Sequence, residues 1–575
     1  MKTENIIIPE KKERTLLPND FKVTSWEALK PYYDNLLERD ITSAADLQQW
    51  FQDRSELEAI LSEDLAWRYI KMTCDTTNEQ LRESYTEFVT QIQPKIAPVS
   101  NELNKKALAN PYLGELKNLN GYPILIRELE KDAQIFREEN IPLQTDAQNE
   151  AQNFGKISGA MSVKINDQEM TLQQAANLLQ ATDREVRKKA YKKITKRRLE
   201  DKDPLNALFT KLIGLRDKIG KNAGFDNYRD YKFTEMGRFD YAPQDCFDFH
   251  EAVAKEVVPM LNDLAKSRKL NLEVKRLRPW DKAVDPEGRS PLKPFKTGKE
   301  LTQKTIAAFG GLDPYLGERI AIMQEMGHLD LESRKGKAPG GYNYPLSETG
   351  VPFIFMNATS NLRDMVTMMH EGGHAVHSFL TRDLELTNFQ HTPSEVAELA
   401  SMAMELISMD HWHLFFEDAE DLKRAKQEHL EQIIETLPWV ATIDKFQHWV
   451  YENSDHTLDQ RVTQWNQIFD TFSDNITDWS ELEEEKSHLW QKQLHLYEVP
   501  FYYIEYGFAQ LGAIAVWKNY RDDPKKGLEG YKNALKLGYT KTIPEVYEAA
   551  NIKFDFSPTY IKSLMNFVRE ELSKI

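Results

Sequence analysis

A five-residue motif, His-Glu-Gly-Gly-His at residues 370–374, carries the most chemical information in this sequence. His370 and His374 are four positions apart, so on a helix their imidazoles lie one turn apart on the same face and can bind one tetrahedral Zn²⁺. Glu371, beside the first histidine, can act as the base for a zinc-activated water. The motif therefore predicts one zinc ion per chain and a catalytic base next to it.

The sequence around the motif predicts the helix that this geometry requires. Apolar residues recur at close to helical spacing across residues 361–380. Gly372 and Gly373 each cost a helix interior about 1 kcal/mol relative to alanine, which predicts a close approach to the helix backbone at this point. We expect a channel or a substrate there. A histidine pair that binds no metal is the alternative.

A catalytic zinc site needs three protein ligands, so a third ligand must lie elsewhere in the chain. The metzincin pattern would place a histidine six residues after His374, where this chain has Leu380. A glutamate from a following helix is the other common solution, and residues 393–407 predict such a helix, with Ser394 as its cap. We choose Glu398, because an unpaired carboxylate among its apolar neighbours would be costly.

Two other glutamates on the same predicted helix have different explanations. Glu395 lies in the first turn, where the helix dipole accounts for an acidic residue. Glu405 lies seven residues after Glu398, two turns away on the same face. It could orient a motif histidine by bonding to the ring nitrogen that does not bind the metal. A plain surface charge explains Glu405 equally well.

These motifs resemble a known family of peptidases. The run HEGGHAVHSF, followed by Glu398 in EVAELASMAMEL 24 residues after His374, resembles the zinc oligopeptidases related to thimet oligopeptidase, specifically the oligoendopeptidase F branch. Residues 338–343 resemble the family's glycine-rich substrate loop, residues 351–357 its active-site edge strand, and residues 495–506 its His/Tyr segment. The resemblance holds in order and spacing over the C-terminal two-thirds and is looser in the N-terminal third.

The resemblance implies a fold and further catalytic groups. The implied fold is mainly α, a large helical zincin-type metallopeptidase with a deep central channel and a small β-sheet next to the active-site helix. The family places a histidine and tyrosines over the zinc, which assigns His495, Tyr502 and Tyr506 as donors to the developing oxyanion. Tyr503, which turns away from Tyr502 by about 100° on a helix, could replace it, since Pro500 interrupts the run. An aromatic stripe that only packs the core is the alternative.

Composition and charge exclude several classes of protein. The chain has 575 residues, of which 41% are hydrophobic, and a formal net charge of −17. This charge argues against nucleic acid as a partner and mildly favours uncharged or basic peptides. No apolar run approaches the roughly 18 residues of a membrane span, and the N-terminus lacks the apolar segment of a signal peptide. We therefore expect a cytoplasmic protein with no membrane partner.

Two local features have ordinary interpretations. The basic segment 187–198 has helical spacing, so we expect a solvated helix face, with an anion site as the alternative. Cys74 and Cys246 are too few for a disulfide framework, and their spacing resembles no thiolate metal site. We expect both to be reduced thiols.

Helical patterns dominate the chain, and two short segments depart from them. Residues 161–172 alternate apolar and polar side chains around an Asn-Asp pair, which predicts a small hairpin. Residues 352–357 predict a strand whose open edge could pair with an extended peptide, and a plain structural hairpin is the alternative. We place the boundary between an N-terminal helical region that roofs the channel (1–200) and a catalytic zinc-peptidase region (201–575) near residue 200.

Together these features predict a metallo-endopeptidase that cleaves short oligopeptides. Glu371 would take the proton of the attacking water and return it to the leaving amine. A carboxydipeptidase of related helical fold shares the motif and the later glutamate, and a catalytically silent peptide-binding protein is a second alternative. A zinc enzyme that is not a peptidase is a third. Substrate preference and oligomeric state have no signal in the sequence.

Overall fold

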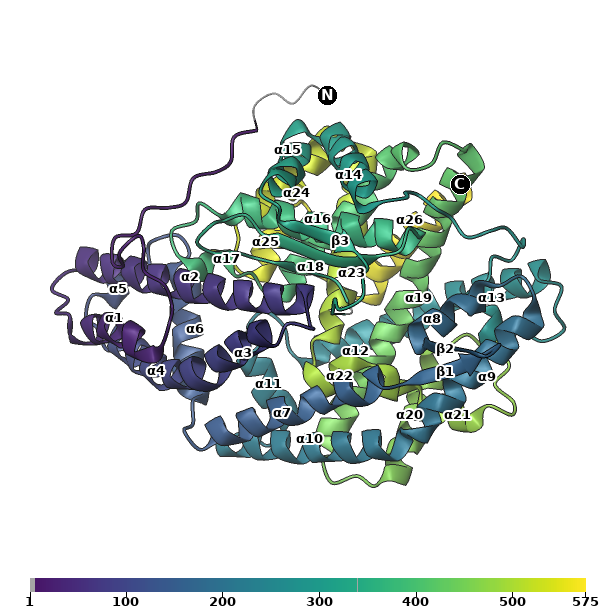
Figure 1. Ribbon diagram of the computed structural model, residues 1–575, viewed down its shortest axis with the longest axis horizontal. Helices are drawn as coiled ribbons and strands as arrows, with labels where there is room; N and C mark the ends of the chain where they lie inside the picture. Colours follow the sequence, from purple (N-terminus) through teal and green to yellow (C-terminus); the bar gives the residue numbers. More distant parts are fainter. Residues whose placement is uncertain (1–5, 339) are drawn as a thin grey trace. The chain divides into compact units, whose positions relative to one another are not determined.

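The computed structural model describes residues 6–338 and 340–575, and most of its elements are helices (Figure 1). Contacts divide the chain into two compact units: unit 1 comprises Met1–Gln134, Leu292–Lys426 and Ala509–Phe554, and unit 2 comprises Ile135–Pro291, Gln427–Phe508 and Asp555–Ile575. The predicted mainly α fold is confirmed. The deep central channel and the boundary near residue 200 stay predictions. Within the described part of the chain, no helix has the length and apolar character that crossing a membrane requires.

Unit 1 contains α1 (Trp26–Glu38), α2 (Ala44–Cys74), α3 (Glu79–Glu87), α4 (Gln93–Leu108), α5 (Leu113–Leu116), α14 (Gly298–Leu312), α15 (Pro314–Glu325), β3 (Leu329–Glu332), β4 (Tyr342–Tyr344), β5 (Phe353–Ala358), α16 (Leu362–Thr381), α17 (Thr387–Gln390), α18 (Ser394–Ile407), α24 (Pro524–Lys536) and α25 (Ile543–Ala549). Unit 2 contains α7 (Asn140–Gly159), β1 (Ser162–Ile165), β2 (Gln168–Thr171), α8 (Leu172–Ala176), α9 (Arg184–Glu200), α10 (Lys202–Asn222), α11 (Tyr228–Glu235), α12 (Pro243–Ala252), α13 (Val258–Asn271), α20 (Leu458–Phe472), α21 (Glu483–Ser487), α22 (Leu494–Glu498) and α26 (Pro558–Lys574). Helices α6 (Tyr122–Ile135), α19 (Ala419–Glu452) and α23 (Tyr503–Asp522) include residues of both units.

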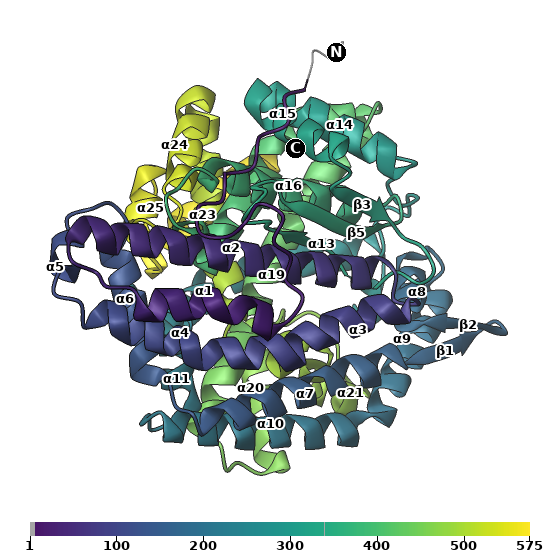
Figure 2. The same ribbon diagram turned by 60° about the vertical axis from the view of Figure 1, so that its left-hand side comes forward.

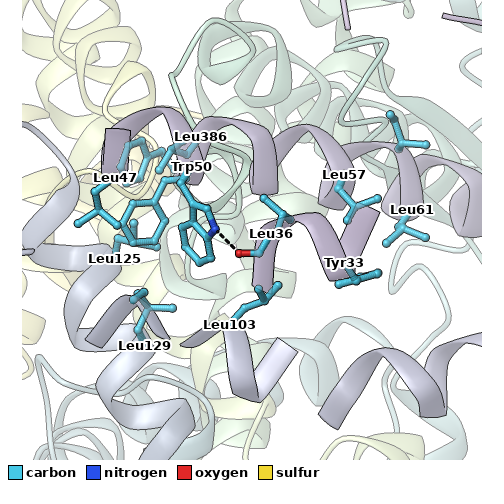
Figure 3. Close-up of a cluster of buried hydrophobic side chains, with 14 of the residues drawn as sticks. Tyr33, Leu36, Leu47, Trp50, Leu57, Leu61, Leu103, Leu125, Leu129 and Leu386 are labelled. Carbon is cyan, nitrogen blue, oxygen red and sulfur yellow. Dashed lines mark hydrogen bonds between the residues drawn. The ribbon is translucent and has the colours of Figure 1, made fainter. Parts of the chain in front are cut away.

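The N-terminal helices of unit 1 enclose an apolar core (Figure 3). Leu36 of α1 and Leu47 of α2 are fully buried in it, and the Trp50 indole Nε1 donates to the Leu36 carbonyl oxygen at 2.8 Å. This bond satisfies the one polar group of a buried indole. Leu386 and Phe389, from the segment after α16, belong to the same core. The N-terminal segment is therefore packed directly onto the part of the chain that follows the HEGGH helix.

A three-stranded sheet of unit 1 contacts α16, as predicted. Its strand order is β3-β5-β4, with β5 parallel to β3 and antiparallel to β4. Phe353 and Phe355 of β5 pack against Ala66 and Ile70 of α2. The predicted strand at residues 352–357 is confirmed, but its predicted open edge is wrong, because β5 has a strand on each side. Strand β4 forms the edge instead.

Unit 2 contains the predicted hairpin, which is seen at the right of Figure 2. Asn166 and Asp167 at its tip have positive φ angles of 51° and 62°, as a tight two-residue turn of this hand requires. The adjacent helix α9 differs from the prediction. Arg187 of α9 is buried, and its guanidinium donates to the carboxylate of Asp281 at 2.9 Å. The basic segment is therefore only partly a solvated face, because Arg187 neutralises a buried carboxylate.

The two helices that carry the predicted ligands begin in different ways. Helix α16 starts with a capping box, in which the Asn361 side chain accepts from the Asp364 N–H at 2.9 Å and Asp364 accepts from the Asn361 N–H. Helix α18 starts at Ser394 with Pro393 as its N-cap residue and no side-chain cap. The prediction that Ser394 caps α18 is therefore wrong, since Ser394 is already the first helical residue.

Gly372 and Gly373 face protein, and the expectation of a channel or substrate beside them is wrong. A Cβ at Gly373 would lie 2.6 Å from the Ala400 carbonyl oxygen and 2.6 Å from Ser401 Cα, both in the backbone of α18. A Cβ at Gly372 would lie 2.7 Å from the Phe309 ring of α14. Gly373 therefore lets α16 pack backbone to backbone against α18, and Gly372 makes room for the Phe309 ring of α14.

Replacing Gly373 with alanine should separate these two helices, because the contacting atoms are backbone and cannot rotate away. We expect Gly373→Ala to lower the free energy of unfolding by about 1–3 kcal/mol, as overpacking of cores typically does. The control is Gly155→Ala in α7, where a Cβ would meet no described atom within 4 Å. Gly155→Ala should raise stability slightly, since alanine is the better helix former. Thermal unfolding of both variants measures the difference, and equal midpoints would contradict this packing.

Candidate active site

The side chains of His370, His374 and Glu398 meet where α16 packs on α18. Glu398 Oε2 lies 3.3 Å from His370 Nε2 and 3.7 Å from His374 Nε2. Ligands of a tetrahedral zinc at 2.0–2.1 Å are roughly 3.3–3.4 Å from one another, so these spacings suit such an ion. One donor atom of each residue lies within 4.8 Å of the other two. The fold therefore brings together the three residues that the sequence predicts as ligands.

Two residues of α18 fix the orientation of this group. Glu405 Oε1 lies 2.6 Å from His370 Nδ1, which directs Nε2 of the ring toward Glu398. The prediction that Glu405 orients a motif histidine is confirmed, and the surface-charge alternative is wrong, because its side chain is only 14% exposed. Ser401 donates from its hydroxyl to Glu398 Oε2 at 3.1 Å. The sequence analysis missed Ser401, although a hydroxyl three positions after the glutamate is a helix neighbour.

The electrostatics of the group favour a positive charge. Burial by itself would lower the pKa of His370, but Glu398 and Glu405 outweigh it and hold that pKa well above its usual value. At His374 burial dominates and lowers the pKa to about 4, although Glu398 opposes the shift. The carboxylates of Glu398 and Glu405 thus lie beside the imidazole pair. This is an environment in which a cation is stabilised.

Glu371 is buried beside the three candidate ligands. Burial raises its pKa to about 7, with His370 opposing the shift and Glu398 and Glu405 adding to it. The backbone N–H of Asn343 on β4 opposes the rise of this pKa, and Asn343 Nδ2 donates to the Glu371 carbonyl oxygen at 3.3 Å. A carboxyl with this pKa can accept and return a proton near neutral pH. Strand β4 therefore holds the candidate base in place.

The glycine-containing loop before β4 is tied to the sheet. Asn357 of β5 donates from Nδ2 to the carbonyl oxygens of Ala338 at 2.8 Å and Gly340 at 2.9 Å. Gly340 has a φ of 103°, which a side chain would strain. Residue 339 of the predicted loop lies outside the described residues. The loop and the edge strand thus form one connected structure next to Glu371.

In unit 2, His495, Tyr502, Tyr503 and Tyr506 form a cluster of four half-buried rings. The ring centroid of His495 lies 6.1 Å from that of Tyr502, 4.8 Å from that of Tyr503 and 5.9 Å from that of Tyr506. Tyr503 does not turn away from this group, because α23 begins only at Tyr503 and Tyr502 lies in the preceding turn. Partial exposure of all four rings differs from what a core-packing stripe would show.

The turn that carries Tyr502 is held in an uncommon conformation. Phe501 has a φ of 67°, which costs a non-glycine residue of order 1–3 kcal/mol. Its N–H donates to Gln447 Oε1 at 2.7 Å, and the buried Arg238 donates to its carbonyl oxygen and, at 3.0 Å, to Glu505 Oε1. Buried polar contacts therefore fix the position at which the tyrosines leave the backbone.

Comparison with known proteins agrees with this architecture. Residues 177–566 match Peptidase family M3, and residues 18–136 match the Peptidase M3 N-terminal domain. The chain belongs to peptidase family M3. This confirms the predicted family and the predicted enzyme class, a peptidase, and the M3 relatives support a metallo-oligopeptidase function.

Individual M3 relatives are similar over most of the chain. Oligopeptidase PepF of Bacillus subtilis (strain 168) is 23% identical over 71% of this chain and 60% of its own length. The oligoendopeptidase F homolog of Lactococcus lactis subsp. lactis (strain IL1403) is 23% identical over 84% of this chain and 80% of its own length. The solved structure of PZ peptidase A with inhibitor 2 is 25% identical and superposes with a TM-score of 0.90 over 96% of this chain and 98% of that one. The predicted fold and branch are therefore confirmed.

Proposed function

We propose that this M3 peptidase is a zinc-dependent endopeptidase that hydrolyses peptide bonds within short oligopeptides. Its zinc ligands are His370, His374 and Glu398, and its general base is Glu371. The observation that carries the proposal is the spacing of 3.3 and 3.7 Å between the Glu398 carboxylate and the two imidazoles, with a buried carboxyl beside them. The names of the relatives, oligopeptidase and oligoendopeptidase, support the substrate class.

The donor set fits zinc in its catalytic form. Two imidazoles and one carboxylate leave a fourth position open, as in other zinc peptidases. Glu405 supplies the carboxylate behind His370 that zinc-binding histidines usually have. When bound, zinc would supply a Lewis acid that activates water and polarises the scissile carbonyl.

The side chains of this chain would handle the proton and the developing charge. Glu371 takes the proton of the attacking water and passes it to the leaving amine, and a pKa of about 7 suits both transfers. By the family resemblance, His495, Tyr502 and Tyr506 donate hydrogen bonds to the oxyanion, which is typically worth about 3 kcal/mol per donor. The half-burial of these rings supports that role.

The edge of β4 is the proposed place for the substrate backbone. Among the described strands, β4 pairs only with β5, so its other side can accept an extended peptide as an added strand. Asn343 lies in the middle of β4 and contacts the main chain of Glu371. Backbone pairing holds a peptide in register whatever its side chains are, which suits an enzyme that accepts many oligopeptides.

Glu371→Gln tests the chemistry with the smallest change of shape. An internally quenched peptide of about ten residues, blocked at both ends, should be cleaved internally by the wild type. The variant should lose on the order of 10²–10⁴-fold in kcat, because glutamine cannot accept a proton, while it still binds one zinc at this site. Unchanged activity would exclude Glu371 as the base, and release of dipeptides only from unblocked peptides would indicate a carboxydipeptidase.

Glu405→Gln tests whether the buried carboxylate behind His370 supports metal binding. We expect zinc affinity to fall about 10–100-fold, with activity restored at excess zinc, since the three ligands remain. Glu529→Gln in α24 is the matched control, because it makes the same charge change on an exposed residue. Titration with a competing chelator measures both affinities, and equal values would contradict the role of Glu405.

Separate Tyr502→Phe, Tyr503→Phe and Tyr506→Phe variants identify the oxyanion donors. Loss of one donor should reduce kcat by about 10²–10³-fold with little change in KM, because the hydrogen bond strengthens only in the transition state. We expect this pattern for Tyr502 and Tyr506, with Tyr503→Phe close to the wild type. A large loss at Tyr503 and none at Tyr502 would exchange their roles, and wild-type kinetics for all three would leave the cluster a packing feature.

A further inference from the structure

Unit 2 contains a second convergence of metal-binding side chains, on two helices that the reaction does not use. Cys246 and His250 lie four positions apart on α12, and Asp444 and His448 lie four positions apart on α19. Residues at this spacing project from one face of a helix, so each helix presents a pair of donors. All four side chains are at most 2% exposed.

Three of the four residues, Cys246, Asp444 and His448, meet at distances that suit a metal site, and His250 is hydrogen-bonded to Asp444 beside them. His250 Nε2 lies 2.9 Å from Asp444 Oδ2, and His448 Nε2 lies 3.2 Å from the same oxygen. Cys246, Asp444 and His448 each offer a donor atom within 4.8 Å of the other two, as His370, His374 and Glu398 of the HEGGH group do. Nitrogen and oxygen ligands of tetrahedral zinc are roughly 3.3 Å apart, and a sulfur ligand is somewhat farther away.

Several buried polar atoms of this group lack the hydrogen bonds that a simple hydrogen-bond network would give them. Within the described residues, Asp444 Oδ1, His250 Nδ1 and His448 Nδ1 are buried and make no hydrogen bond. Each such atom costs about 1–3 kcal/mol. Aromatic rings, including Phe247 at 4.8 Å and Phe501 at 5.4 Å from the His448 ring centroid, surround the group. An ion that uses the free carboxylate oxygen would remove part of this cost.

The charges and donor types select the ion. A Cys246 thiolate and the Asp444 carboxylate carry two negative charges, and neutral histidines add none, so a divalent cation makes the buried group neutral. Thiolate and imidazole donors prefer zinc over the hard cations Mg²⁺ and Ca²⁺, which bind oxygen. We propose that Cys246, Asp444 and His448 bind a second, structural zinc ion that ties α12 to α19, with the orientation of Asp444 fixed by its hydrogen bond from His250. Because all of these side chains are buried, no substrate can reach an ion there.

Cobalt substitution tests this site independently of activity. The proposed site around Cys246, here called the Cys246 group, contains a sulfur ligand, whereas the two histidines and the glutamate of the HEGGH group do not. A thiolate-to-Co²⁺ charge-transfer band in the near ultraviolet therefore reports on the Cys246 group alone. We expect the band in wild type loaded with Co²⁺ and its loss in Cys246→Ser. Cys74→Ser, which changes the other cysteine of the chain, should keep the band.

Metal analysis of the zinc-loaded protein gives the stoichiometry. Wild type should hold one more zinc per chain than Cys246→Ser or Asp444→Asn, and His374→Ala should keep the charge-transfer band when loaded with Co²⁺. Circular dichroism shows whether the variants are folded, and Asp444→Asn keeps the side-chain volume if Cys246→Ser does not fold. A wild type that shows no charge-transfer band and the same zinc content as Cys246→Ser would overturn the proposal and leave the four residues as a hydrogen-bond network.

Discussion

The close contact between α16 and α18 is the constraint on which the candidate active site depends. The Gly373 backbone approaches Ala400 and Ser401 so closely that a single methyl group would not fit. At this separation the carboxylate of Glu398 lies within 4 Å of both motif histidines. Two rigid helices fix ligand positions better than loops do, because their side chains start from a backbone that cannot rearrange locally. Gly373 costs helix stability, and the close approach of Glu398 to both histidines is what it permits.

Around this contact, several polar side chains each have a defined partner. Glu405 contacts His370, Ser401 contacts Glu398, and Asn343 contacts Glu371. Burial of a carboxylate is unfavourable, yet the same burial raises the pKa of Glu371 into the range that proton transfer near neutral pH requires. Glu63 of α2 holds a loop of the same unit in place. Its carboxylate accepts from the backbone N–H of Thr349 at 2.7 Å and so anchors the turn between β4 and β5.

Local rules were sufficient to predict part of this site from sequence. The HEGGH helix and Glu398 followed from helical spacing and from a carboxylate among apolar residues, both of which are properties of one short segment. The edge strand was misassigned, because which strand lies at an edge depends on pairing partners distant in the chain. Arg187 was misplaced for the same reason, since its partner Asp281 is 94 residues away. The roles of His495 and the tyrosines came from family resemblance, and sequence periodicity alone left them open.

The two groups of ligands are built by the same local rule and differ in what surrounds them. Each begins with side chains four apart on a helix, completed by residues of a second helix. The histidine side chains of the HEGGH group are 20% and 19% exposed, so a substrate and water can reach an ion there. The Cys246 group is enclosed by aromatic rings, so an ion there could only hold helices together. Sequence searches for cysteine pairs overlook the Cys246 group, because it combines one cysteine, one aspartate and two histidines from two helices that are distant in the sequence. A search for paired donors at a spacing of four residues would have found both groups. The burial of the side chains then distinguishes a site that substrate can reach from one that can only be structural.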